Sequence, residues 1–343
     1  MPIYNCVKYL EDAIRSVLSS GIFDIEIIAV DDMSSDGSRE LLMSLAKAHS
    51  EIKPILNDRN LGVAESRNIA LSAARGEYIA FCDADDIVIE NAYKNMLDAA
   101  DGRDMIIGAH ADLFDSGEIR HAHLGAREKA SLFLAAFSVS CLWTKLIRRD
   151  FILHHDLTFD SFMKIGEDVV FLADLVTVRP SFKVLDILVY YHCHHSEGNP
   201  SLNHTYTFDA FYYHILCRER VLRICEDFPE CRDFIYLSFS SFITEMLDKM
   251  RHTADIEEAF NLYRSHMLSY DFNRKKGLFK SLVGIPYDKF TTATAEVYFR
   301  IKDEVTPREK VLWEFRSGRI GFRFIVKYFI AWIKFKLKIT EDK

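Results

Sequence analysis

In the first half of the chain, short apolar segments with strand character alternate with segments whose apolar residues recur at helical spacing. We expect strands over residues 26–30, 53–56, 77–82 and 104–109, and helices over 7–18, from about Ser38, over 62–74 and over 90–99. Asn5 is a candidate N-cap for the first helix. Strand–helix alternation of this kind predicts an α/β fold with a mostly parallel sheet covered by helices.

Carboxylates follow two of the predicted strands directly. Asp31 and Asp32 come after the strand 26–30, and Asp83, Asp85 and Asp86 end the segment YIAFCDADD. Parallel sheets bind their ligands at the carboxyl ends of the strands, so these acids are expected at one edge of one sheet. Acids this close together either extend into solvent or surround a cation. Their position favours the cation, because Mg²⁺ and Mn²⁺ bind through one or two carboxylates and the phosphates of a substrate.

The character of the sequence changes near residue 200, where long helix-compatible stretches with few turn signals begin. We therefore predict three parts in the 343-residue chain: an α/β domain over 1–200, a helical extension over 201–315 and a basic amphipathic helix over 316–343. The net charge of −8 argues against nucleic acid as a partner.

The cysteines and the apolar segments indicate the cell compartment in which we expect the protein. The seven cysteines are scattered and include no C-x-x-C pair, which is typical of reduced thiols in a cytosolic protein. We find no signal peptide and no apolar run long enough to span a bilayer. These features predict a cytoplasmic location.

The last segment combines basic and apolar residues at helical spacing. Its cations recur at intervals of three, four or seven, at Arg316, Arg319, Arg323, Lys327, Lys334 and Lys338, and aromatic and aliphatic residues fill much of the remainder. A helix of this composition lies in a membrane interface, and we expect it to hold the protein at the cytosolic face of an anionic membrane. The alternative is a helix that packs on the rest of the protein and leaves its cations in solvent.

Six blocks of sequence, in this order and spacing, resemble those of family 2 glycosyltransferases, which have the GT-A fold. The resemblance covers about residues 1–200. The blocks are MPIYNCVKYLEDAIRSVL at 1–18, EIIAVDDMSSDGS at 26–38, NLGVAESRNIAL at 60–71, GEYIAFCDADD at 76–86, WTKLIRRD at 143–150 and KIGEDVVFL at 164–172. Family members usually begin with an apolar strand before the first block, and we expect this chain to lack it.

The resemblance implies a nucleotide-diphosphate sugar as the donor, with UDP the commonest nucleotide in the family. On this interpretation Pro2, Tyr4 and Asp32 line the base pocket. Asp83 faces the ribose, and Arg67 lies near the phosphates. Without the family context, Arg67 would be interpreted as a surface cation of a helix.

The resemblance also implies a metal and a catalytic base. Asp85, with Asp83 beside it in the D-x-D motif, would bind Mn²⁺ or Mg²⁺ at the donor diphosphate. Asp168 matches the family's base, at the start of a predicted helix over 169–175. The alternative is that Glu167 and Asp168 are only favourable charges in a first helical turn, and for Glu167 we retain it. Asp31 is expected to order the loop that follows it.

The implied activity is an inverting transfer of one sugar to a hydroxyl of a saccharide or lipid-linked acceptor, in the synthesis of a surface polysaccharide or glycolipid. A glycoside hydrolase would also use two carboxylates, but its acids need not follow a nucleotide-binding pattern. A shortened homologue that has lost activity and serves as a binding or scaffold subunit is the second alternative. His192 and His194 lie in a segment that borders the active site in the family, and each is either a metal ligand or an ordinary loop histidine.

Overall fold

The computed structural model describes residues 1–123, 132, 136, 141–195 and 207–224, and shorter pieces between 246 and 262. The chain divides into two compact units, Met1–His204 with Leu216–Asp233, and Thr205–Ile215 with Phe234–Lys343. All the predicted site residues belong to the first unit. The predicted helix over 316–343 and most of the predicted helical extension lie outside the described residues.

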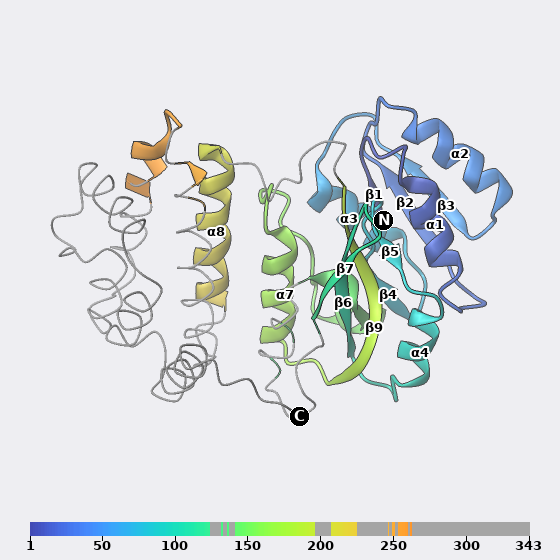
Figure 1. The fold of residues 1–343 in the computed structure, drawn as a ribbon. Helices are drawn as coiled ribbons and strands as arrows, with labels where there is room; N and C mark the ends of the chain where they lie inside the picture. The colour runs from blue at the N-terminus through green and yellow to red at the C-terminus, as the bar shows by residue number, and fades with distance from the viewer. Residues whose placement is uncertain are drawn as a thin grey trace, which may run out of the picture. The chain divides into compact units, whose positions relative to one another are not determined.

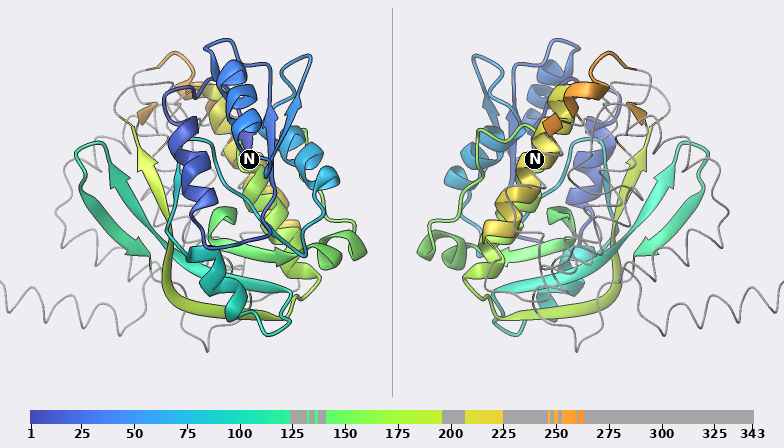
Figure 2. Two further views of the ribbon diagram at one scale, coloured as in Figure 1. Left: turned by 90° about the vertical axis from the view of Figure 1, so that its right-hand side faces the viewer. Right: turned by 90° about the vertical axis from the view of Figure 1, so that its left-hand side faces the viewer.

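A three-stranded parallel sheet opens the first unit, with the strand order β1-β2-β3. Its strands are β1 (Pro2–Ile3), β2 (Ile27–Asp31) and β3 (Ile52–Leu56), and the helices that alternate with them are α1 (Leu10–Leu18), α2 (Ser38–Ala48) and α3 (Val63–Ala73). Helices α1 and α2 lie on one side of the strands and α3 on the other (Figures 1 and 2). This part follows the predicted alternation closely.

The first strand, which we expected to be lacking, is reduced to two residues. Pro2 pairs with Val30 and Ile3 with Asp31, and Ile3 is fully buried. The expected N-cap is wrong, because α1 begins only at Leu10 and follows Tyr9 without a side-chain cap. Asn5 instead adopts a φ of 51° and accepts a hydrogen bond from the Ser35 N–H. It therefore joins the loops that follow β1 and β2.

A second, six-stranded sheet is mixed, which corrects the prediction of mostly parallel pairing. Its order is β4-β8-β6-β9-β5, with β7 paired to β6. Within the described part of this sheet only β6 and β9 pair in parallel, and its other pairs are antiparallel. The strands are β4 (Tyr78–Ala80), β5 (Ile87–Val88), β6 (Met105–Phe114), β7 (Ile119–His123), β8 (Lys145–Arg148) and β9 (Phe182–His194). Antiparallel neighbours need no helical crossover, so the alternation of strands and helices does not reveal them.

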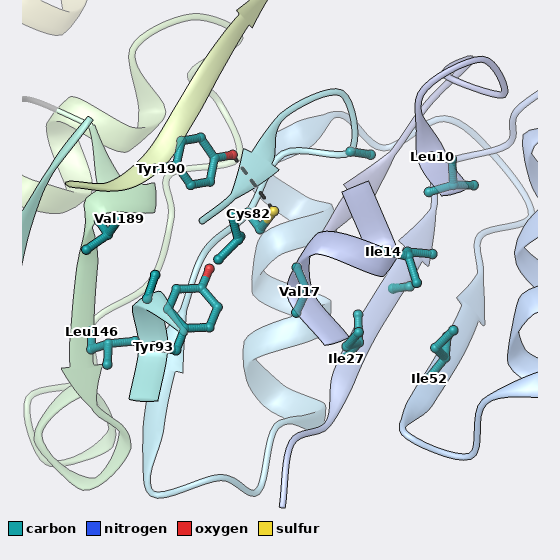
Figure 3. Packing of buried hydrophobic residues seen from close by; sticks show 14 of the residues in the cluster. Leu10, Ile14, Val17, Ile27, Ile52, Cys82, Tyr93, Leu146, Val189 and Tyr190 are labelled. Carbon is teal, nitrogen blue, oxygen red and sulfur yellow. Dashed lines mark hydrogen bonds between the residues drawn. The ribbon is translucent and has the colours of Figure 1, made fainter. Parts of the chain in front are cut away.

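The buried core connects the two sheets. Leu10, Ile14 and Val17 recur on one face of α1, where they are at most 6% exposed, and they belong to the same apolar cluster as Val189 and Tyr190 of β9. Figure 3 shows this cluster. Helices α4 (Ala92–Asp98), α6 (Arg149–His154) and α7 (Glu167–Thr177) complete this part of the structure, and α8 (Phe208–Ile224) follows.

No helix among the described residues has the length and apolar character that crossing a membrane requires. The five cysteines in the described part of the chain, Cys6, Cys82, Cys141, Cys193 and Cys217, are all free thiols.

Candidate active site

The acidic loop, residues Asp83 to Asp86, connects β4 to β5. Asp86 is buried, whereas the side chain of Asp83 is 31% exposed. Burial and the adjacent carboxylates of Asp83 and Asp85 raise the pKa of Asp86 well above its usual range. Burial and Asp83 likewise raise the pKa of Asp85. The protein environment thus disfavours ionisation here, and a cation bound beside these groups would favour it.

Asp86 anchors the acidic loop to β9. Its two carboxylate oxygens accept hydrogen bonds from the Tyr190 hydroxyl at 2.9 Å and from the Cys193 N–H at 2.7 Å. The Tyr190 hydroxyl in turn accepts a hydrogen bond from the Asp83 N–H at 3.1 Å. Both carboxylate oxygens of Asp86 therefore have hydrogen-bond partners within the protein. Asp83 and Asp85 are the carboxylates of this loop that remain to contact a ligand.

Arg67 of α3 joins the acidic loop to the start of α7. One of its terminal nitrogens donates to Asp83 at 2.8 Å, and the other donates to Glu167. The side chains of Arg67 and Glu167 are only 8% and 9% exposed, and the Asp83 and Glu167 carboxylates raise the pKa of Arg67 against the effect of burial. A buried cation held by two carboxylates is costly to disrupt, because removing one partner leaves the remaining charges uncompensated.

Asp168 lies beside this charge network, in the first turn of α7. One of its oxygens accepts a hydrogen bond from the Val169 N–H at 2.8 Å. Burial raises the pKa of Asp168, and the Arg67 guanidinium opposes that shift. Because helix α7 directs its N-terminal N–H groups toward this end, it also favours the ionised carboxylate. A carboxylate with a raised pKa in such a position is suited to accept a proton.

The two acids at the end of β2, Asp31 as its last residue and Asp32 directly after it, organise loops. Asp31 is fully buried and accepts a hydrogen bond from Arg39 at 2.6 Å, and its second contact is with the Ser34 N–H at 3.4 Å. It orders the loop as expected. Asp32 accepts three hydrogen bonds, from the Asn57 amide at 2.8 Å and from the N–H groups of residues 61 and 62 at 2.8 and 2.7 Å. A carboxylate has about four acceptor positions, so Asp32 keeps one for the predicted contact with a base.

The chain start lies near the acidic loop. Tyr4 is 52% exposed, as a residue in an open base pocket would be, and Pro2 is half-buried in β1. Tyr9 stacks on His195 with ring centroids 3.6 Å apart. The Nε2–H of His195 donates to the backbone carbonyl of Asp85 at 2.9 Å. This pair of rings connects the residue before α1 to the backbone of the predicted metal ligand.

The contacts bring together four of the acidic and basic residues named above: Arg67, Asp83, Glu167 and Asp168. Pro2, Tyr4 and Asp32 lie at the neighbouring ends of β1 and β2 and make no described contact with these four.

Several residues of the site have roles that no sequence pattern predicted. Glu167 is more than a helix-end charge, because it is the partner of Arg67 100 residues away in the chain. Tyr190 and His195 belong to the histidine-rich segment that borders the active site in the family, but nothing in the sequence indicated that both hold the acidic loop. Lys145 is fully buried near Asp168, and burial lowers its pKa to about 8. In the sequence, only the family block WTKLIRRD at 143–150 drew attention to Lys145.

His192 and His194 both contact Asp112 of β6. His192 Nδ1 lies 3.2 Å and His194 Nε2 2.9 Å from the same oxygen, Asp112 Oδ1. The two histidines alternate along β9 and therefore share one face of the strand. Asp112 was not identified from the sequence.

Comparison with known proteins shows which family the first half of the chain resembles. Residues 1–163 match the model for glycosyl transferase family 2. The chain is 27% identical over 200 residues to the uncharacterized glycosyltransferase EpsJ of Bacillus subtilis, a match that covers 54% of this chain and 57% of EpsJ. It is 24% identical over 330 residues to the minor teichoic acid biosynthesis protein GgaB of Bacillus subtilis, covering 92% of this chain and 33% of GgaB. The chain thus spans less than two thirds of the length of these relatives.

Solved structures confirm the GT-A fold. Staphylococcus aureus TarS 1–349 in complex with UDP-GlcNAc superimposes with a TM-score of 0.67 at 18% identity, over 92% of this chain and 90% of that chain. The mannosyltransferase PcManGT from Pyrobaculum calidifontis, in complex with GDP-Man and Mn²⁺, gives a TM-score of 0.51 at 14% identity, over 88% and 85% of the two chains. At such low identity the likeness concerns the fold alone.

Proposed function

Because the chain belongs to glycosyl transferase family 2 through residues 1–163, we propose that it transfers a sugar from a UDP-sugar donor to a hydroxyl acceptor, with inversion, in the assembly of a surface polysaccharide or glycolipid. The observation that carries this proposal is the bridge from Asp83 through Arg67 to Glu167, because it holds the D-x-D loop beside Asp168. Two similarities support it. A protein of the same fold, TarS, forms a complex with UDP-GlcNAc, and a relative, GgaB, is named for teichoic acid biosynthesis.

The residues of the acidic loop fit a divalent cation. Apart from its own N–H, no described donor bonds the Asp85 carboxylate, and burial beside Asp83 raises its pKa. Asp85, with Asp83 next to it, would hold Mn²⁺ or Mg²⁺, both of which prefer oxygen ligands. The structural neighbour PcManGT contains Mn²⁺, which supports the same assignment. When bound, such a cation neutralises negative charge that develops on a leaving diphosphate.

In the proposed mechanism, Asp168 acts as the base. Its carboxylate accepts the proton of the acceptor hydroxyl while that oxygen bonds to the anomeric carbon and the bond from this carbon to the donor diphosphate breaks. Arg67 fixes the position of Asp83 relative to the first turn of α7. The donor and the base therefore stay aligned. The raised pKa of Asp168 makes it a better proton acceptor than an ordinary aspartate.

The test is donor turnover by the full chain, with a panel of nucleotide sugars in the presence of Mn²⁺ or Mg²⁺. We expect the Asp168→Asn variant to bind donor as tightly as the unaltered protein and to lose transfer by about 10²-fold or more, because the base is gone. We expect Asp85→Ala to lose cation-dependent nucleotide binding. Equal transfer by Asp168→Asn and the unaltered protein would refute the base assignment. Binding without turnover of any donor would instead favour a binding or scaffold subunit.

A further inference from the structure

Three side chains from β6 and β9 form a compact group outside the acidic loop. Asp112, His192 and His194 each offer one ligand atom, and these atoms all lie within 4.8 Å of one another. The group arises from strand register, since Asp112 is the direct partner of His192 in the parallel pair, and His194 is two residues further along β9. Asp83 and Asp85 contribute no atom to it.

The two imidazole rings are held by stacking. The ring of His194 stacks on Phe114 of β6, with centroids 4.6 Å apart and an interplanar angle of 11°. His192 stacks on Trp143 at 5.7 Å and 19°. Imidazole rings held by stacking lose little side-chain conformational freedom when a ligand binds between them. The group is therefore preorganised for binding.

The distances suit a small cation. Ligand atoms about 2.0–2.2 Å from a tetrahedral ion are roughly 3.4 Å apart. The two nitrogens lie 3.2 and 2.9 Å from Asp112 Oδ1, and no two of the three ligand atoms are more than 4.8 Å apart, so modest side-chain adjustments would admit the ion. The side chains of the three residues are 42%, 30% and 18% exposed for His192, His194 and Asp112, so an ion reaches them from solvent.

We propose that Asp112, His192 and His194 form a second metal site, distinct from the acidic loop, that binds a Zn²⁺-class transition-metal ion. Imidazole nitrogens select such ions over Mg²⁺, and Zn²⁺ binds this donor set more tightly than Mn²⁺ does. Three protein ligands leave one coordination position for water or another oxygen ligand. The ion would cross-link β6 to β9 where Cys193 of β9 and His195, directly after the strand, hold the acidic loop.

The experiment titrates the full chain with Co²⁺, the spectroscopic substitute for Zn²⁺, in the Asp85→Ala background so that the acidic loop does not contribute. We expect one equivalent to bind with the ligand-field absorption of a site containing nitrogen ligands, and Zn²⁺ to displace it. Adding His192→Ala with His194→Ala should weaken binding by at least about 100-fold, because even the loss of an outer partner costs 10- to 100-fold. Asp112→Asn, which removes the charge and keeps the size of the side chain, should also weaken Co²⁺ binding.

The matched control is a histidine pair elsewhere in the described chain, His154 and His155, whose replacement by alanine should leave Co²⁺ binding unchanged. Loss of all Co²⁺ binding in Asp85→Ala alone would overturn the proposal, since the ion would then belong to the acidic loop. Absence of stoichiometric binding in that background would also overturn it, and so would Co²⁺ binding that Asp112→Asn and the double histidine replacement leave unchanged. In those cases the group is only a hydrogen-bonded cluster.

Discussion

The Tyr190 hydroxyl joins the two ends of the acidic loop, because it donates to Asp86 and accepts from the N–H of Asp83. Tyr190→Phe should lower the free energy of unfolding by about 1–3 kcal/mol, since the buried Asp86 carboxylate loses a donor that nothing replaces. Denaturant unfolding measures this change. Tyr93→Phe is the matched control, because Tyr93 is also buried and no described group bonds its hydroxyl. An equal loss in both variants would contradict the anchoring role of Tyr190.

Glu167 should make stability depend on pH. Burial, and next Asp168, raise the pKa of Glu167 from 4.5 to about 7, although Arg67 opposes the shift. The folded state therefore binds the proton more tightly than the unfolded state. Its stabilising contribution is complete below about pH 4.5 and is lost as the pH rises through 7.

We expect the unfolding free energy of the unaltered protein to fall relative to that of Glu167→Gln over this pH window, by a few kcal/mol at most. Urea denaturation of both proteins at several pH values measures the difference. A difference that stays constant with pH, or that grows in favour of the unaltered protein, would show that Glu167 is ionised throughout the window.

At the scale of the elements, the close contact of β6 with β9 depends on Gly108. A Cβ at this position would lie 2.6 Å from Val189 Cγ1, where the pairing register also shifts between Ile107 and Ala109. Gly108→Ala should therefore lower the free energy of unfolding by about 1–3 kcal/mol through overpacking. Val189→Ala added to it should restore part of the loss, because it removes the atoms in the clash.

Gly76→Ala is the control for that change, since its added Cβ would approach no heavy atom closer than 3.4 Å, the distance to the Tyr78 carbonyl oxygen. Thermal unfolding of the three variants gives the comparison. If Gly108→Ala and Gly76→Ala destabilise the protein equally, close approach of the two strands is not the reason for glycine at 108.

At the scale of the whole molecule, we expect membrane attachment to depend on the predicted tail helix. Residues 316–343 lie outside the described residues, so the prediction depends on the basic and apolar composition of the tail. Anionic lipid should add roughly 1 kcal/mol of attraction per basic residue near the surface. We expect the full chain to co-sediment with anionic liposomes at low salt, and a variant that ends near Pro307 to stay in the supernatant. If both stay in the supernatant, the tail packs on the protein instead.

Local patterns alone determined much of the fold. The predicted helices over 62–74 and 90–99 correspond to α3 and α4, and the predicted helix over 169–175 corresponds to the centre of α7. The strands over 26–30 and 53–56 are within one residue of β2 and β3. Periodicity and capping act over a few residues, so a sequence shows them directly. The acids after β2 and β4 were found for the same reason.

Only the tertiary structure decided how the charges pair. Arg67 has two carboxylate partners, 16 and 100 residues away, and Asp86 has partners on β9 more than 100 residues away. The mixed sheet places these segments together, and the pairing of β9 with β5 and β6 has no local signature in the sequence. Asp112, too, acquires its two histidine partners from register alone, because neighbouring strands bring opposite residues together whatever their separation in the chain.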